Sequence, residues 1–117
     1  MHEFNVCQTI VETVEKQQKL LSPKQRLIGV NLVIGKLRSI VPDYLQFAYE
    51  QMTADTPLAG SKINVRVPAL HGRCEVCKWE GELEKPRILC KACGGTRGEF
   101  LDGRELFLES LEVEDDE

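Results

Sequence analysis

The sequence predicts an α+β fold, in which a small mixed sheet has two helices on one face and an inserted four-cysteine zinc-binding module. Three observations carry this prediction: two stretches with the apolar spacing of amphipathic helices, three stretches that alternate as strands do, and two Cys-x-x-Cys pairs late in the chain. We expect residues 1–69 and 99–117 to form the α+β domain and residues 70–98 to form the zinc-binding module.

The first helix is predicted by one apolar stripe near the N-terminus. Four positions, i, i+3, i+4 and i+7, are apolar from Cys7 onward: Cys7, Ile10, Val11 and Val14. The helix runs to about residue 20 and stops before Ser22-Pro23, because the residue before a proline disfavours helical geometry. We interpret Cys7 as a buried thiol that packs like a small hydrophobe.

The second helix is predicted over residues 42–52. Proline suits its first turn. An apolar stripe follows, flanked by two aromatic residues that we expect in the core: Val41, Leu45, Ala48 and Met52, with Phe47 and Tyr49 beside them.

Three strands complete the predicted domain. Residues 26–34 alternate, with one strongly apolar face that includes Ile28, and Gly35 ends this strand. Residues 63–67 form a half-buried strand that ends at Pro68. The last strand opens at Gly103 and runs to about Val113, so the metal module lies between the last two strands. If those two strands pair, the two ends of the module lie close together.

The metal module is predicted by its four cysteines, Cys74, Cys77, Cys90 and Cys93. Two Cys-x-x-Cys pairs supply four thiolates on tight turns, which suits a closed tetrahedral Zn²⁺ site. Gly81, Gly94 and Gly95 follow the pairs, and glycine allows the positive φ and the close backbone approach that such turns often need. Two disulfides, or an iron centre with the same four ligands, are the alternatives. A closed site of this kind stabilises a fold and carries out no chemistry.

Composition excludes several classes of function. The 117 residues are 42% hydrophobic and 29% charged, with no apolar run long enough for a membrane span and no N-terminal targeting pattern. We therefore expect a cytoplasmic protein with reduced thiols. The net charge of −4 argues against general nucleic-acid binding. The chain has no nucleophile motif and no phosphate loop, so we do not expect an enzyme.

The extreme N-terminus offers a second metal site. The α-amino group of Met1, the backbone nitrogen of His2 and its imidazole can bind one metal through fused chelate rings, and Glu3 can support the imidazole or the metal. Deprotonated amides give a planar nitrogen field, which suits Cu²⁺ and Ni²⁺ better than Zn²⁺. The other histidine, His71, is interpreted as an exposed or hydrogen-bonded linker residue.

Together these features resemble the HypA family of hydrogenase-maturation nickel metallochaperones. The matching motifs occur in order over nearly the whole chain: Met1-His2-Glu3, Gln8-x-Ile10-Val11-x-x-Val14, Val30-x-Leu32-x-Ile34-Gly35-x-Leu37, Val41-Pro42-x-x-Leu45-x-Phe47-Ala48-Tyr49-Glu50, the two cysteine pairs and Gly103-Arg104-Glu105-Leu106. The sequence departs from the family where Phe4-Asn5 replaces a common Leu-Ser or Met-Ser.

The resemblance implies a nickel carrier. Nickel would be transient cargo held at His2, with Glu3 and Met1 beside it, in the domain of residues 1–69 and 99–117. Zinc would be structural at the four cysteines. The implied partners are a HypB-type GTPase and the large subunit of [NiFe] hydrogenase, with urease accessory proteins in organisms where the family also serves urease. We expect a monomer or a weak homodimer.

Two alternatives from other classes stay open. The first is a zinc-ribbon module that binds nucleic acid or a protein partner. Cations in the module are interspersed with glutamates, so no stripe that follows a phosphate backbone is evident. The second is an electron carrier with iron at the four cysteines, which visible absorbance of the purified protein would distinguish from zinc.

Overall fold

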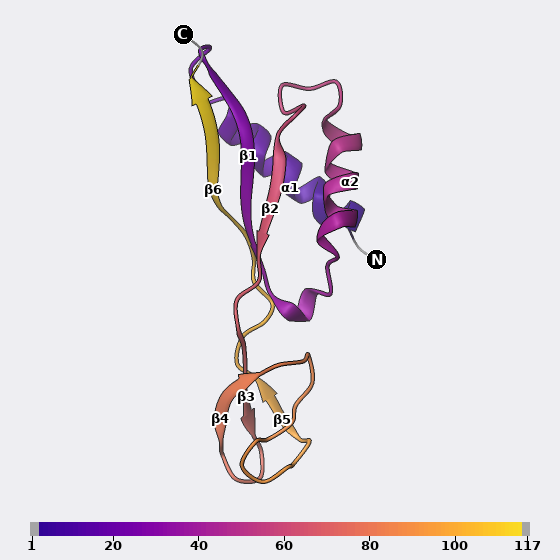
Figure 1. Ribbon diagram of the computed structural model, residues 1–117, viewed down its shortest axis with the longest axis vertical. Coiled ribbons are helices and arrows are strands. Elements are labelled where there is room, and N and C mark those ends of the chain that lie inside the picture. The colour runs from indigo at the N-terminus through magenta and orange to yellow at the C-terminus, as the bar shows by residue number, and fades with distance from the viewer. Residues whose placement is uncertain (1–2, 116–117) are drawn as a thin grey trace. The chain divides into compact units, whose positions relative to one another are not determined.

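The computed structural model describes residues 3–115 and divides into two compact units. The first unit contains the residues up to 32, residues 40–66 and the residues from 107 onward. The second unit contains residues 33–39 and 67–106 (Figure 1). Within residues 3–115, no helix has the length and apolar character needed to span a bilayer.

Two helices pack on each other in the first unit. α1 spans Glu3–Gln18 and buries the predicted stripe, with Cys7 and Val14 fully inaccessible. α2 spans Pro42–Thr53, with proline in its first turn as predicted. The expectation for its aromatic residues was half wrong, because Tyr49 is fully buried whereas Phe47 is exposed.

The sheet of the first unit has the strand order β2-β1-β6, with β1 at Gln25–Ile34, β2 at Lys62–Arg66 and β6 at Leu106–Asp115. β1 and β2 run in the same direction and β6 runs in the opposite one, so the sheet is mixed (Figure 1). The strands on either side of the metal module, β2 and β6, do not pair with each other, because each pairs with β1.

The two faces of this sheet differ in polarity. Residues of the three strands bond across one face: Asn31 donates to Ser110 over 3.0 Å, and Asn64 donates to Asn31 over 2.9 Å. On the other side Val30 and Leu32 are buried, and α1 passes behind the sheet (Figure 1). Ile28 was expected on this apolar face but is exposed. The predicted arrangement of two helices on one face of a small mixed sheet is confirmed.

A buried polar cluster closes the loop between α2 and β2. The Tyr49 hydroxyl lies 2.7 Å from the Ser61 hydroxyl, which donates to the Leu58 carbonyl over 2.6 Å. Thr53 donates to the Tyr49 carbonyl over 2.7 Å. Each buried hydroxyl therefore has a partner, as burial of polar groups requires. The cluster positions the loop that returns the chain to the sheet.

The second unit contains an antiparallel sheet with the order β4-β3-β5. Its strands are β3 at Leu70–Cys74, β4 at Glu80–Leu83 and β5 at Gly98–Phe100. The short helix η1, at Lys36–Arg38, also belongs to this unit. Gly103 was predicted to open the last strand, but it has φ +105° and forms a turn in which Glu105 accepts from its N–H over 2.9 Å. β6 begins three residues later.

Candidate metal centres

The four predicted zinc ligands converge at one end of the second unit. One ligand atom from each of Cys74, Cys77, Cys90 and Cys93 lies within 4.8 Å of all the others. The Sγ atoms of Cys74 and Cys93 are 3.7 Å apart, and those of Cys77 and Cys90 are 3.5 Å apart. A tetrahedron with Zn–S bonds of about 2.3 Å has S···S edges of about 3.8 Å. The spacing therefore fits a metal site with four thiolate ligands.

The same distances rule out the disulfide alternative. All four cysteines are free thiols, and the separations far exceed an S–S bond of about 2.05 Å. Both zinc and iron accept four thiolates, so the donor set fits either metal. Among residues 3–115, no other group of three or more metal-binding side chains has its ligand atoms this close together.

Two turns of matching design hold the sulfurs. In the first, the N–H of Cys74 donates to the Trp79 carbonyl over 2.7 Å, and the N–H of Lys78 donates to the Cys74 carbonyl over 3.1 Å. The second turn has the same two bonds sixteen residues later. The N–H of Cys90 donates to the Gly95 carbonyl over 2.9 Å, and the N–H of Gly94 donates to the Cys90 carbonyl over 2.9 Å. Each pair of cysteines is thus presented by one closed loop with the same backbone geometry.

Both turns need a left-handed residue directly after the second cysteine. Gly94 supplies it in the second turn with φ +76°, as predicted. In the first turn the equivalent residue is Lys78, with φ +66°, which the sequence did not reveal. The φ of Gly81 is not positive, so of the two uses expected of glycine here it serves the close approach. A Cβ at Gly81 would instead overlap the ring of Trp79, so this glycine makes room for the indole.

The electrostatics of the cluster favour a divalent cation. The N–H groups of Cys77 and Val76 lower the pKa of Cys74. Burial opposes ionisation of Cys90, but the N–H groups of Cys93 and Ala92 prevail and lower its pKa to about 6.

The other two thiols hold their protons. The N–H of Gly95 favours the Cys93 thiolate, but the neighbouring thiolates of Cys90 and Cys74 outweigh it and raise its pKa to about 12. The N–H of Trp79 likewise favours the Cys77 thiolate, but the contact with Cys90 and burial together outweigh it and raise the pKa of Cys77. Four negative charges cannot share this volume alone, so metal binding completes the ionisation and releases protons.

The predicted N-terminal site falls mostly outside the described residues. Met1 and His2 lie outside them, and Glu3 is the first residue of α1. The Glu3 carboxylate is buried, with 7% exposure, and accepts a hydrogen bond from the N–H of Val41 over 3.4 Å. Val41 precedes the first turn of α2. Glu3 therefore ties the beginnings of the two helices together.

His71 is hydrogen-bonded within the second unit. Its Nδ1 lies 2.7 Å from one carboxylate oxygen of Asp102, and its backbone N–H donates to the other oxygen over 2.7 Å. Burial opposes ionisation of Asp102, but these two contacts prevail and lower the pKa of its carboxyl. Sequence reasoning missed Asp102, because thirty-one residues separate it from its partner.

Comparison with known proteins finds relatives over nearly the whole chain. A family model described as "Hydrogenase/urease nickel incorporation, metallochaperone, hypA" matches residues 1–113. The chain is 40% identical over 115 residues to the hydrogenase maturation factor HypA of Geotalea uraniireducens, covering 97% of this chain and 100% of that protein. The chain belongs to the HypA family. The HypA of Geobacter metallireducens is 36% identical over 115 residues, with 97% of this chain and 100% of that protein covered.

Solved HypA structures share the fold. The solution structure of the Ni metallochaperone HypA from Helicobacter pylori aligns with a TM-score of 0.63 at 18% identity, covering 99% of this chain and all of that one. A second HypA solution structure aligns with a TM-score of 0.62 at 20% identity, covering 96% and 95% of the two chains. The resemblance drawn from the sequence is therefore confirmed at the level of family and fold.

Proposed function

We propose that this HypA-family chain is a nickel carrier for the maturation of [NiFe] hydrogenase. It binds Ni²⁺ at its N-terminus through His2, the backbone and the α-amino group of Met1, and it keeps a structural Zn²⁺ at the four cysteines. It works in the cytoplasm with a HypB-type GTPase and the hydrogenase large subunit, and it is a maturation factor without catalytic activity. The observation that supports this most is a family match that covers residues 1–113 and therefore includes the N-terminal residues.

The donor groups at the N-terminus suit a metal ion that is bound and then released. An amine, an amide nitrogen and an imidazole form the planar nitrogen field that Ni²⁺ accepts. Protonation of the amine and the imidazole weakens binding, which allows the metal to leave. A closed thiolate cluster has no open position and exchanges its metal poorly. Cargo and structural metal therefore belong to different sites.

Glu3 has a positioning role in this proposal. Its carboxylate is engaged by the N–H of Val41 and is buried, so it fixes the first turn of α1 beside α2. The described chain is therefore held in place at the residue that follows His2 in the sequence. Pre-organisation of this kind reduces the entropy that metal binding must overcome.

Nickel titration of untagged protein tests the proposal, because an N-terminal extension removes the free amine from Met1. We expect wild-type protein to bind one Ni²⁺ and His2→Ala to lose it, while zinc content stays at one per chain in both. His71→Ala is the matched control, since it removes the only other histidine and should keep nickel binding. Equal nickel affinity in wild type and His2→Ala refutes the N-terminal site.

The ion pairs of the second unit give little support to the nucleic-acid alternative. Arg73 pairs with both Glu80 and Glu99, and Arg97 lies 3.7 Å from Glu75. Arg73 and Arg97 are therefore engaged within the unit, and glutamates are interspersed among the other cations of the module, whereas phosphate binding needs several free cations on one face. The carrier proposal is preferred because the family match covers residues 1–113.

A further inference from the structure

Large apolar side chains are exposed where the two helices of the first unit begin. Phe4 is 55% exposed, Val41 41%, Tyr44 63% and Phe47 57%. Single exposed apolar residues are ordinary, but a group that includes three aromatic rings is not. We call these four residues the aromatic face.

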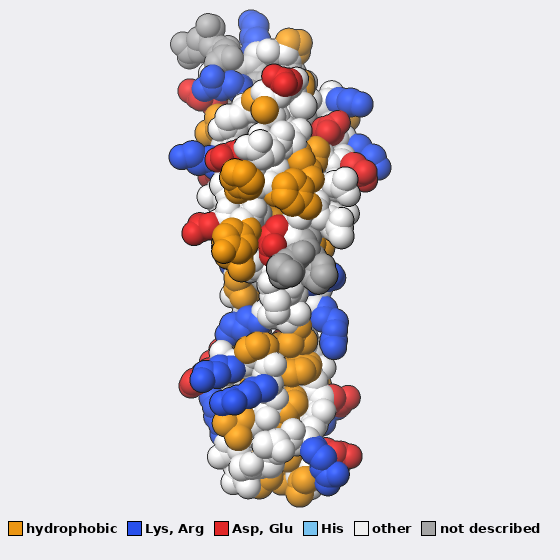
Figure 2. Space-filling view, turned by 90° about the vertical axis from the view of Figure 1, so that its right-hand side faces the viewer, with side chains coloured by type: hydrophobic (Ala, Val, Ile, Leu, Met, Phe, Trp, Pro, Cys, Tyr) orange, Lys and Arg blue, Asp and Glu red, His pale blue; other side chains and the backbone are white. Residues whose placement is uncertain are grey.

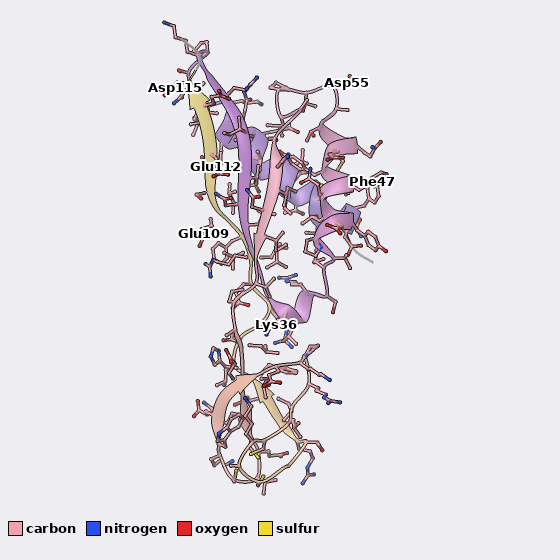
Figure 3. The ribbon with its side chains drawn as sticks, in the orientation of Figure 1. Lys36, Phe47, Asp55, Glu109, Glu112 and Asp115 are labelled. Carbon is pink, nitrogen blue, oxygen red and sulfur yellow. The ribbon has the colours of Figure 1, made fainter. Side chains whose placement is uncertain are left out.

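The contacts of the first unit bring the members of the aromatic face together. The bond from Val41 to Glu3 places the first turn of α1, which carries Phe4, beside the start of α2. Tyr44 and Phe47 are three residues apart on α2 and are therefore neighbours on its surface. Figure 2 shows hydrophobic side chains gathered on this side of the first unit, and Phe47 points away from the sheet (Figure 3).

The charged residues of α2 and of the first thirteen residues of α1 are all acidic, and Lys16 in the last turn of α1 is the one basic residue on these two helices. From Glu3 to Glu15 and from Pro42 to Thr53 the sequence contains no lysine or arginine. It contains five acidic residues: Glu3, Glu12, Glu15, Asp43 and Glu50. Gln46, beside Phe47, donates to Glu50 over 3.0 Å. An apolar surface with an acidic border is complementary to an apolar surface bordered by lysine and arginine. The acidic border of this face also repels an anionic membrane.

We propose that the aromatic face docks the protein with which this chain exchanges nickel, and that the contact surface of that partner is apolar and bordered by lysine and arginine. The inference rests on the proposed function. Metal transfer requires donor and acceptor ligands to come within bonding distance of one ion, so the partner must cover the surface beside Glu3. Exposed tyrosine and phenylalanine are the residues that interfaces favour, because they bury a large area at small entropic cost.

The test uses a purified HypB-type GTPase as the probe and measures its binding by calorimetry. The double variant Tyr44→Ala/Phe47→Ala removes two rings that contribute little to the core. We expect binding to weaken at least about thirtyfold, as loss of central interface residues does. Leu20→Ala is the matched control, because Leu20 is 78% exposed, belongs to the same unit and lies beyond the end of α1. It should bind the GTPase within about twofold of wild type.

Two further measurements separate this inference from the proposed function. The double variant should keep the nickel stoichiometry and affinity of wild type, so loss of docking with intact nickel binding supports the inference alone. The charge reversal Asp43→Lys/Glu50→Lys should also weaken binding, and it should reduce its dependence on salt.

Several outcomes overturn the inference. One is unchanged GTPase binding by the double aromatic variant, and another is no binding by wild type. Tighter binding after charge reversal is a third. Concentration-dependent dimerisation that the double variant abolishes would assign the face to a second copy of this chain instead.

Discussion

Replacement of Gly94 by alanine should weaken zinc binding through the backbone alone. Gly94 has φ +76°, and a Cβ built on it has no other heavy atom within 4 Å. The added methyl group therefore causes no clash beyond its own backbone. The turn that presents Cys90 and Cys93 nevertheless requires this left-handed conformation, because the N–H of Gly94 donates to the Cys90 carbonyl over 2.9 Å.

The expected cost follows from two opposing terms. A left-handed conformation costs an L-residue about 1–2 kcal/mol. Alanine also restricts the unfolded chain, which by itself stabilises the fold by about 0.4–1 kcal/mol. The net loss is then about 1 kcal/mol, or roughly a fivefold change in an equilibrium constant. Because folding of a small module with four cysteine ligands is coupled to its metal, we expect a similar loss in zinc affinity.

A competition titration against a chromophoric zinc chelator measures this loss. Lys78 occupies the equivalent position of the first turn with φ +66°, so Lys78→Gly should raise zinc affinity by a few-fold or less. Gly60→Ala is the control, since Gly60 has φ +87°, equally open space and a place in the first unit. It should destabilise that unit and leave zinc affinity unchanged. If Gly94→Ala binds zinc as tightly as wild type, the argument from backbone strain fails.

Two further predictions concern groups away from the metal. Cys7 is fully buried, and burial raises its pKa to about 11, so only about one thiol in a thousand is ionised at pH 8. Because the reagent must also reach a side chain with no exposed surface, alkylation of the folded chain should reach Cys7 last even after zinc is removed, as peptide mapping would show. Arg66 lies 2.6 Å from Glu109 and lowers the pKa of its carboxyl below 4.5. The stabilisation from this pair is present above pH 4.5 and is lost as the pH falls through the lowered pKa, so Arg66→Met should raise the Glu109 pKa in a carboxyl NMR titration. An unchanged titration curve would contradict the ion pair.

Short-range patterns predicted the elements well, because their causes lie within a few residues. The stripe that includes Cys7 and Val14 is a property of one helix, and it is buried as expected. Pro42 marks the start of α2 for an equally local reason. The failures concern which side of an element meets the core. Ile28 and Phe47 continue apolar patterns but are exposed, because the positions of neighbouring strands and helices decide burial.

Pairing between distant segments was beyond the sequence for the same reason. β2 and β6 flank β1 instead of pairing with each other. Asp102 reaches His71 across thirty-one residues, and Tyr49 shares a buried hydroxyl cluster with Ser61. Each of these contacts depends on how the chain folds back on itself, which the spacing of nearby residues does not determine.

The cysteines were predictable because their chemistry is repeated locally, and the repetition has a physical consequence. Two backbone hydrogen bonds close each turn. The N–H of the first cysteine donates to the carbonyl five residues later, and the carbonyl of the same cysteine accepts from the N–H four residues later. The geometry of each sulfur pair is thus set within a single loop, and the metal joins the two loops. One loop uses glycine at its left-handed position and the other uses Lys78. The first turn therefore carries backbone strain that the second avoids, which is why Lys78→Gly and Gly94→Ala should shift zinc affinity in opposite directions.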